Sequence, residues 1–396
     1  MDYEQFLQDY MSRPVVKEIA FPESEFRLRI GEVRKVMDEK GLDALLVTYA
    51  PNVSYLSGYQ SFGSGWYSCL ILPREGEPIL HMHELEIGPA MLTSWVNDIR
   101  VIKWSYGGEA EGLASILKER SLEGCRIGIE PKRAGLSIDL YEGLKRALPD
   151  VTFIDASGVA AQPRMIKSPA EVDYMRQAAQ ITKKAFDAVL PVIKPGVTDN
   201  QMAAVLYHTL ISEGSEYFST QPIVSAGQRS GIWHTTFRRT PVQTGDTVIL
   251  EFGAAYQRYT SAIMHAVSIG KPSSAVERSS KIINETLDLL FEAVKPGRTA
   301  HDVAREVGVG MNEISPVPIV LGYSIGLGLP PTWGEDLYFI REGIDLELKP
   351  GMTFHSPLTD RTPGMPGVGF SETWVVTETG CEILTMHDRQ LTVVEV

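Results

Sequence analysis

Two glutamates stand where a carboxylate is costly. Glu251 interrupts the apolar run VILEFGA, and Glu372, in GFSETWVV, directly precedes another apolar run. Because an ionised carboxylate is unfavourable in apolar surroundings without a partner, such positions favour function over structure. A carboxylate can attack an electrophilic carbon or deprotonate water, so both residues are candidates for a catalytic nucleophile or general base.

Two histidines and a tyrosine are further candidates. His234 lies in GIWHTTFRR and His355 in MTFHSPL, and an imidazole titrates near neutral pH, as a proton carrier must. From the residues alone, His234 is equally well an ordinary loop histidine and His355 a hydrogen-bonded core histidine. Tyr323, between glycine and serine, either donates a hydrogen bond to a ligand or packs.

The segment that carries Glu251 is predicted to be a hairpin. In VILEFGAAYQRYTSAIMHAVSIGKP, residues 248–272, one apolar run ends at a turn near residues 256–259 and a second ends at Gly270. Two such runs around a short polar turn are typical of paired antiparallel strands.

The chain repeats itself around this hairpin. KPGVTDNQMAAVL begins at Lys194 and KPGRTAHDVAREV at Lys295, and in each a helix is predicted to end at glycine and another to start at threonine. KPGMTF begins at Lys349, but a strand is predicted to follow it. The repeat predicts a duplicated α/β unit, with a site where its halves meet.

The first part of the chain alternates helices and strands. SEFRLRIGEVRKVMDEKG predicts a helix that Ser24 caps and Gly41 ends, with Leu28 among its apolar residues. Short apolar strands follow in ALLVT, WYSCLILP, EPILHM, RIGIEP and VTFIDA, with a helix in DLYEGLKRAL. This alternation predicts an α/β domain over residues 1–160.

A strong helix start marks the next domain. Ser168 is a predicted N-cap, Pro169 takes the first helical position, and Glu171 completes a capping box. We assign residues 161–396 to the second domain, consistent with a chain of 396 residues being too long for one ordinary core.

Composition excludes several classes of partner. The formal net charge is −13 and the basic residues form no block, which argues against nucleic acid and membrane surfaces as partners. The 3 cysteines are far apart and predict neither a disulfide framework nor a zinc ribbon. The acidic N-terminus does not resemble a signal peptide, so we expect a cytoplasmic protein.

Several motifs, in order along the chain, resemble the creatinase, prolidase and methionine aminopeptidase superfamily. They are PNVSYLSGY, RMIKSPAEVDYMRQAA, WHTTFRRTPVQTGDTVILEFGA, LGYSIGLGLPP and GFSETWVVTETGCEILT. The resemblance implies a smaller N-terminal α/β domain followed by a pita-bread catalytic domain of two pseudo-symmetric halves. It also implies a homodimer.

The resemblance is incomplete at the metal ligands. Metal-dependent members of the superfamily supply two aspartates, a histidine and two glutamates, whereas the matching positions here hold Glu251, Ala262, Tyr323, His355 and Glu372. Only Glu372 keeps the residue type of the superfamily. Two divalent cations need more anionic oxygens than this set offers, so we expect no metal and no cofactor.

Metal-free members are the better comparison, and the ectoine hydrolase branch resembles this chain in GYSIGLGLPPTWGE and in a hairpin glutamate. That resemblance implies a catalytic Glu251, with His234 matching the catalytic histidine upstream of the hairpin. Glu372 is expected to pair with a cationic substrate, and His355 to carry protons. The expected reaction is hydrolysis of a C–N bond in a small amidine or amide, with ring opening of ectoine or hydroxyectoine as the leading candidate.

Substrate-binding residues are expected around these groups. Tyr323 is expected to donate to the leaving nitrogen or to a substrate carboxylate, and Arg238 to bind such a carboxylate, although an arginine in a loop is usually solvated. Trp66 and Tyr67 are expected either to wall the pocket of a partner subunit, as in creatinase-like dimers, or to be core aromatics of a strand.

Two other functions fit the same residues. A prolidase-like Xaa-Pro dipeptidase with a non-standard metal site would contain metal and lose activity with a chelator. A catalytically inactive, ligand-binding member would bind a small molecule without forming product.

Overall fold

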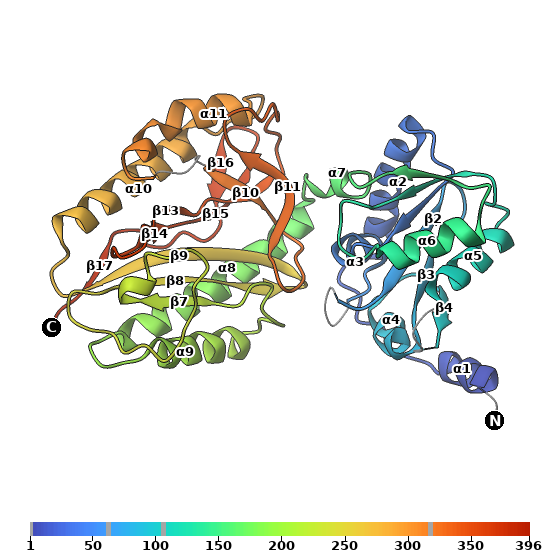
Figure 1. Ribbon diagram of the computed structural model, residues 1–396, viewed down its shortest axis with the longest axis horizontal. Coiled ribbons are helices and arrows are strands. Elements are labelled where there is room, and N and C mark those ends of the chain that lie inside the picture. The colour runs from blue at the N-terminus through green and yellow to red at the C-terminus, as the bar shows by residue number, and fades with distance from the viewer. Residues whose placement is uncertain (1–2, 61–64, 104–107, 316–319) are drawn as a thin grey trace. The chain divides into compact units, whose positions relative to one another are not determined.

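The computed structural model describes residues 3–60, 65–103, 108–315 and 320–396, and the chain forms two compact units, Met1–Arg164 and Met165–Val396 (Figure 1). The predicted boundary between residues 160 and 161 lies at the start of helix α7 (Ala161–Arg164), the last element of the first unit. Among the described residues, no helix is long and apolar enough to cross a membrane.

The first unit is a mixed sheet with helices around it. Its described strands pair in the order β4-β3-β2-β1-β5-β6, with both parallel and antiparallel neighbours. The strands are β1 (Ala44–Val47), β2 (Ser68–Pro73), β3 (Ile79–His83), β4 (Asp98–Ile102), β5 (Arg126–Ile129) and β6 (Thr152–Asp155). The helices before α7 are α1 (Tyr3–Ser12), α2 (Glu23–Glu39), α3 (Ala50–Ser57), η1 (Glu84–Glu86), α4 (Ile87–Thr93), α5 (Glu109–Glu119) and α6 (Ile138–Ala147).

Helix α2 corrects one detail of the sequence prediction. It begins at Glu23 with Pro22 as N-cap, and Ser24 does not cap it. Leu28 is 68% exposed, because the buried face consists of Phe26, Arg29, Ile30, Val33 and Met37 at helical spacing. Gly41, with φ of 61°, follows the helix as predicted.

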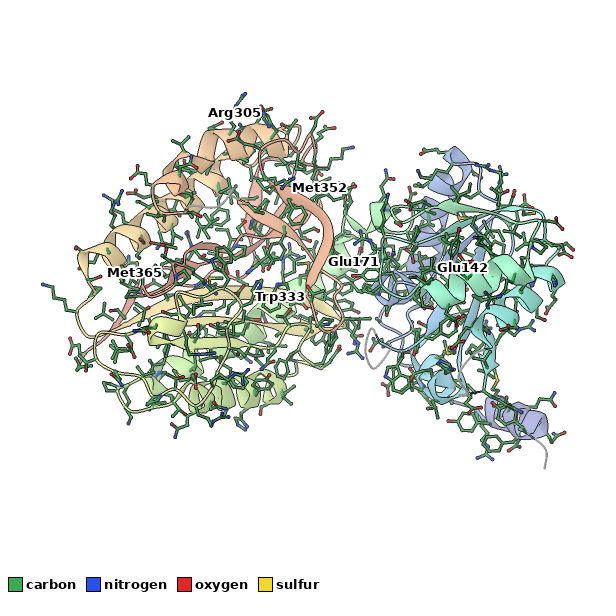
Figure 2. All side chains as sticks on the ribbon, in the orientation of Figure 1. Glu142, Glu171, Arg305, Trp333, Met352 and Met365 are labelled. Atoms are coloured by element: carbon green, nitrogen blue, oxygen red, sulfur yellow. The ribbon has the colours of Figure 1, made fainter. Side chains whose placement is uncertain are left out.

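The first half of the second unit contains the predicted hairpin. Its elements are α8 (Pro169–Val189), η2 (Leu190–Val192), α9 (Asp199–Ser212), β7 (Ile223–Ala226), η3 (Gly227–Arg229), β8 (Thr247–Tyr256) and β9 (Tyr259–Ile269). The capping box between Ser168 and Glu171 is present at the start of α8 (Figure 2 labels Glu171). Strands β8 and β9 are joined by Gln257 and Arg258, both with positive φ, as a tight hairpin turn requires.

The second half repeats the helix pair and adds a further sheet. Its elements are α10 (Ser274–Ala293), α11 (Ala300–Val307), η4 (Gly308–Glu313), β10 (Gly322–Ile325), β11 (Gly334–Ile340), β12 (Thr353–His355), β13 (Leu358–Asp360), β14 (Val368–Phe370), β15 (Thr373–Val376), β16 (Cys381–Ile383) and β17 (Thr392–Val394). The described strands form the sheets β17-β9-β8-β7, β11-β10-β12-β15-β16 and β13-β14.

The two halves have matching helix turns and separate cores. Between α8 and α9, and again between α10 and α11, a glycine with φ near 85° (Gly196, 87°; Gly297, 83°) precedes a threonine that caps the next helix. Figure 1 shows α8 and α9 on one side of the strands and α10 and α11 on the other. One hydrophobic core lies under α8 and α9 and the other under α10 and α11, with β8 and β9 contributing to both.

Candidate active site

A cavity of about 700 Å³ lies where the two halves of the second unit meet. Among the sequence-predicted residues, Glu251, His234 and Tyr323 line it. The rest of its wall is largely aromatic, apolar or hydroxylic: Tyr207, Phe218, Ser219, Thr220, Gln221, Ile223, Thr236, Pro330, Pro331, Thr332 and Trp333. The hairpin, the loop after η3 and the loop before β11 thus converge on one site.

Strand β8 holds Glu251 at the bottom of this cavity. Glu251 lies opposite Met264 on β9 and Ile223 on β7, and its side chain is 9% exposed. Directly opposite residues of an antiparallel pair share a face, so Glu251 and Met264 project to the same side. That side is occupied by Arg361.

Arg361 is the partner that the buried carboxylate needs. Its Nη2 lies 3.7 Å from Glu251 Oε2 and 3.6 Å from Met264 Sδ, and its guanidinium lies 5.9 Å from the ring centroid of Trp233. Burial raises the pKa of Glu251, and Arg361 opposes that rise. The same burial lowers the pKa of Arg361, and Glu251 opposes that fall. Arg361 therefore limits, without reversing, the rise in the Glu251 pKa that burial causes.

Two loops dock to position Arg361. Gly367 N donates to Ser230 Oγ at 2.9 Å, and a Cβ on Gly231 would lie 2.2 Å from Met365 O. The loop that carries Trp233 therefore packs closely on residues 361–367. That segment begins with Arg361 and contains Met365, which is labelled in Figure 2.

His234 stands on the loop after η3 in a left-handed backbone conformation. Its φ is 56°, a conformation that is uncommon for a residue with a side chain and that active sites sometimes hold. Its side chain is exposed and lines the cavity. The exposed imidazole of His234 therefore shares this cavity with the buried carboxylate of Glu251.

Tyr323 and His355 stand side by side on paired strands. Tyr323 of β10 is in register with His355 of β12, and their ring centroids lie 5.5 Å apart. Trp333, labelled in Figure 2, donates from Nε1 to the Tyr323 hydroxyl at 2.8 Å and lies 5.9 Å from His355. The indole fixes the phenol, and His355 lies behind both rings rather than in the cavity lining.

The burial of His355 determines its protonation. The residue is completely buried, Nδ1 lies 3.3 Å from Thr373 Oγ1, and Nε2 has no hydrogen-bond partner among the described residues. Desolvation lowers the pKa of His355 to about 3. At neutral pH the ring is therefore uncharged, which suits a hydrogen-bonding role better than the predicted proton-carrying one.

The structure does not bring Glu372 to the cavity. Its neighbour Thr373 faces the hairpin, where Thr373 Oγ1 donates to Ala262 O at 2.9 Å. Glu372, between β14 and β15, instead contacts the segment that follows β16. There it accepts a hydrogen bond from Thr385 and lies 3.1 Å from His387 Nδ1 and 3.4 Å from Arg389 Nε.

The remaining predicted residues also lie outside the cavity lining. Arg238 has an exposed side chain, and its backbone N donates to Asp199 Oδ2 at 2.8 Å. In the first unit, Trp66 is half-buried, and the Tyr67 hydroxyl lies 2.7 Å from His81 Nδ1 in that unit's own core. Of the two predicted roles for Tyr67, its surroundings match the core aromatic.

The donor set does not fit the metal pair that the fold family implies. Of the five corresponding positions, Ala262 offers no side-chain ligand, Glu251 faces a guanidinium, and the Glu372 carboxylate contacts His387 and Arg389. Within residues 3–60, 65–103, 108–315 and 320–396, no group of three or more His, Cys, Asp or Glu side chains is arranged to hold a metal ion.

Sequence reasoning missed Arg361. It lies in the loop sequence TDRTPG, which has the composition of a solvated turn, so periodicity gives no sign of its burial. The available signal was the buried carboxylate itself, because Glu251 in an apolar strand requires a cation nearby.

Comparison with known proteins decides the family. Residues 29–166 match the creatinase/prolidase N-terminal domain, and residues 173–378, more than half of the chain, match metallopeptidase family M24. The chain belongs to the M24 family. The predicted superfamily and the predicted two-domain, pita-bread fold are thereby confirmed, and the protein is an M24 hydrolase.

Relatives of this M24 protein have more than one activity. The ectoine hydrolase of Halomonas elongata is 28% identical, covering 94% of this chain and 98% of that protein. The Xaa-Pro dipeptidase of Pyrococcus furiosus is also 28% identical, covering 92% and 99%. The solved structure of an X-Pro aminopeptidase from Thermotoga maritima superposes with a TM-score of 0.81 at 26% identity, covering 92% of this chain and 99% of that one.

Proposed function

We propose that this M24 protein hydrolyses a C–N bond of a small amidine or amide without a metal ion, with ectoine or hydroxyectoine as the leading substrate. The observation that carries the proposal is the Glu251–Arg361 pair at the cavity. A carboxylate held by a guanidinium is a poor metal ligand, because the cation already neutralises it. The pKa of Glu251 is raised by burial, which makes the ionised carboxylate a stronger base, and Arg361 favours that ionised form.

The proposed first step belongs to Glu251. Its carboxylate either attacks the electrophilic carbon or takes a proton from water that attacks there. Arg361, 3.7 Å away, favours the anionic form of the carboxylate before the step. Acid quenching during turnover, followed by mass measurement of the intact protein, distinguishes the two routes, because only direct attack leaves a covalent adduct.

The proposed second step is protonation of the departing nitrogen. His234 is the candidate donor, because its imidazole reaches both the cavity and solvent and is reprotonated from water. The Tyr323 hydroxyl, whose position Trp333 fixes, is proposed to hydrogen-bond the substrate. The C–N bond breaks as the amine takes the proton, and water supplies the oxygen of the product.

The aromatic rings of the cavity wall favour a cationic substrate, whereas Glu251, paired with Arg361, adds little net charge. Glu251 is the one carboxylate among the described residues that line the cavity, and these include no lysine or arginine. A cyclic amidinium ring also fits the aromatic and proline wall, because its charge is delocalised over a flat apolar ring. A substrate carboxylate would have to meet a cation beyond the lining, at Arg361 or Arg238.

The test is a substrate panel under chelation. Enzyme treated with a chelator is incubated with ectoine, hydroxyectoine, creatine and the dipeptide Gly-Pro, and products are identified by mass spectrometry. We expect ring-opened product from ectoine or hydroxyectoine. Dipeptide cleavage that appears only when manganese is restored would contradict the proposal and support the Xaa-Pro dipeptidase alternative, which the P. furiosus relative favours.

Two further expectations belong to this proposal. A cytoplasmic homodimer is expected from the resemblance, with Trp66 of a partner subunit walling the cavity. Sedimentation velocity measures the oligomeric state, and Trp66→Ala should raise KM without changing kcat if that side chain only lines the substrate pocket.

A further inference from the structure

A buried ion pair lies close behind the cavity wall. Lys167 Nζ donates to Glu335 Oε2 at 2.5 Å, and each of the two side chains is 1% exposed. Lys167 directly precedes Ser168, the N-cap of α8, and Glu335 lies at the start of β11, two residues after Trp333. Neither partner is among the described residues that line the cavity, so the pair is not expected to touch a substrate.

Stability alone does not account for a pair of this kind. Removing two charges from water costs free energy that their mutual attraction seldom repays, and apolar residues of similar size in their place are often neutral or stabilising. The best attested use of buried charges is to fix how the elements that carry them are placed. Here those elements are the start of α8 and the start of β11.

The Lys167–Glu335 pair packs on a glycine that has no room for a side chain. A Cβ on Gly326 would lie 2.7 Å from Lys167 Cε and 3.0 Å from Glu335 Oε1. Gly326 directly follows β10, and its carbonyl oxygen accepts a hydrogen bond from Thr260 N of β9 at 2.9 Å. The pair therefore joins α8 to β11 across the end of β10, beside the hairpin.

The strands joined in this way carry two rings of the cavity. Tyr323 lies on β10, and Trp333, just before β11, donates from Nε1 to the Tyr323 hydroxyl at 2.8 Å. The ladder between β10 and β11 is irregular, because its register shifts between Tyr323 and Ile325. Strand pairing thus fixes Trp333 less strictly than a regular ladder would, and other contacts have to set its position.

Two contacts flank the indole. On one side Trp333 N donates to Thr220 Oγ1 at 3.1 Å, and on the other Glu335 is held by Lys167. The first contact is made by the backbone of Trp333 itself, whereas the second anchors the strand that continues from it. The ion pair is therefore the contact that ties this part of the wall to α8.

We infer that Lys167 and Glu335 are positioning residues. Their ion pair sets the place of Trp333, and the indole in turn sets the place of the Tyr323 hydroxyl in the cavity. The effect on turnover rests on the proposed function, in which that hydroxyl binds the substrate. The effect on the two rings does not.

The variant Lys167→Met/Glu335→Met tests the inference. It removes both charges and keeps apolar volume, so no buried charge is left without a partner and the fold should be retained. Its matched control is Lys184→Met/Glu213→Met, because Lys184 also belongs to α8 and its ion pair, at 2.6 Å, is exposed. Circular dichroism checks the fold of each.

Gly326→Ala is a second, independent perturbation. The added methyl group would push the Lys167 and Glu335 side chains apart without changing a charge. Gly326 has no positive φ, so alanine fits the backbone there. This variant decides the question if the double variant does not fold.

The indole signal of Trp333 reports the position of the rings. In protein labelled with ¹⁵N-tryptophan, this signal is assigned from its loss in Trp333→Phe, and Tyr323→Phe gives its position without the hydrogen bond. In Lys167→Met/Glu335→Met and in Gly326→Ala the signal should move toward its position in Tyr323→Phe, and in the control it should stay. An unmoved signal in both folded variants would overturn the inference and leave the pair a purely structural role.

Kinetics test the link to turnover. Tyr323→Phe and Lys167→Met/Glu335→Met should each raise KM for ectoine about tenfold, and the combined variant should be no worse than Tyr323→Phe alone. Effects that multiply would contradict action through Tyr323. If the wild-type protein turns over no compound of the substrate panel, the proposed function fails, and the indole signal alone still decides whether the pair positions the rings.

Discussion

The Glu251 carboxylate and the Arg361 guanidinium each favour the charged form of the other, against the effect of burial. Removing one partner of a buried pair typically costs about 3–5 kcal/mol, because the other charge is left without compensation. The pair is looser than a direct hydrogen-bonded bridge, at 3.7 Å, and Arg361 Nε has no partner among the described residues. Such spacing leaves the carboxylate oxygens accessible for chemistry.

Glu251→Gln should abolish turnover while preserving the fold. The amide keeps the size of the side chain but can neither attack carbon nor accept a proton, so kcat should fall on the order of 10³-fold. Glu313→Gln, at an exposed ion pair with Arg278, is a matched control and should retain activity. A Glu251→Gln enzyme with normal kcat and an unchanged circular dichroism spectrum would remove Glu251 from the mechanism.

Arg361→Met should change the pH dependence of activity. Burial raises the pKa of Glu251 and Arg361 holds it down, so loss of the guanidinium raises that pKa further. Less of the carboxylate is then ionised at neutral pH, and activity recovers as pH rises. The acidic limb of the kcat/KM profile should therefore move to higher pH, and an unmoved limb with lowered stability would indicate a purely structural role.

The buried histidines should make the protein acid-labile. Desolvation lowers the pKa of both His265 and His355 to about 3 in the folded chain, against about 6.5 when unfolded. Between these values the unfolded state binds more protons, so stability decreases as pH falls, by about 1.4 kcal/mol per unit for each histidine.

A variant separates this effect from the titration of carboxylates. His265 packs between Phe186 and Phe370, with ring centroids 4.7 and 5.2 Å away, so His265→Phe should fit. Between about pH 4 and 5.5, the free energy of unfolding measured in urea should fall less steeply with pH than in the wild type, by about 1.4 kcal/mol per pH unit. If the stability of His265→Phe depended on pH as steeply as that of the wild type, the His265 ring would not resist protonation in the folded chain.

For single residues, the sequence predicts which side chains are chemically unusual better than it predicts the direction in which those side chains point. Glu251, His234 and Tyr323 were expected at the site and line one cavity. Glu372 was expected there too, but it contacts Thr385, His387 and Arg389, which belong to the segment after β16 and which no local pattern around Glu372 reveals. Arg361 depends on loop docking between Ser230 and Gly367, which leaves no periodic trace.

The secondary structure elements follow sequence signals wherever capping and turn chemistry fix them. The Ser168 capping box, the hairpin of β8 and β9, and the helix turns at Gly196 and Gly297 were all predicted and are all present. The error at Leu28 arose because α2 buries Phe26 and Arg29, so that the apolar face is rotated from where the aliphatic residues alone placed it. Because Arg29 is charged, a pattern of apolar residues does not place it in the buried face.

The repeated helix turns predict a matched pair of effects. Gly196→Ala and Gly297→Ala should each destabilise the protein by about 1 kcal/mol, because alanine is strained at φ of 87° and 83°. A methyl group added at either glycine would meet no atom within 4 Å, so the cost is conformational alone.

The control for this pair is Gly31→Ala, within α2. That position is also open, has no positive φ, and should gain up to about 1 kcal/mol from the helix propensity of alanine. Denaturant unfolding measures the free energy of unfolding of all three glycine variants. Unchanged stability in both turn variants would contradict the requirement for a left-handed residue at the start of each repeat.

For the whole molecule, the family can be assigned without knowing the reaction. The fold and the M24 membership follow from motifs along most of the chain, and relatives of similar identity include both an ectoine hydrolase and Xaa-Pro dipeptidases. A shared fold supports several chemistries, so the reaction has to be argued from the site. Here the site carries one arginine-paired carboxylate, and the hairpin position of a second holds Ala262.

The most direct measurement is therefore the rate of ectoine opening against the metal content of the enzyme. Protein is stripped with a chelator, its metal content is measured by mass spectrometry, and turnover is followed while manganese or cobalt is added back. We predict full activity at less than a tenth of an equivalent of metal and no increase on addition. Activity that rises in proportion to bound metal would contradict hydrolysis by the Glu251–Arg361 pair alone.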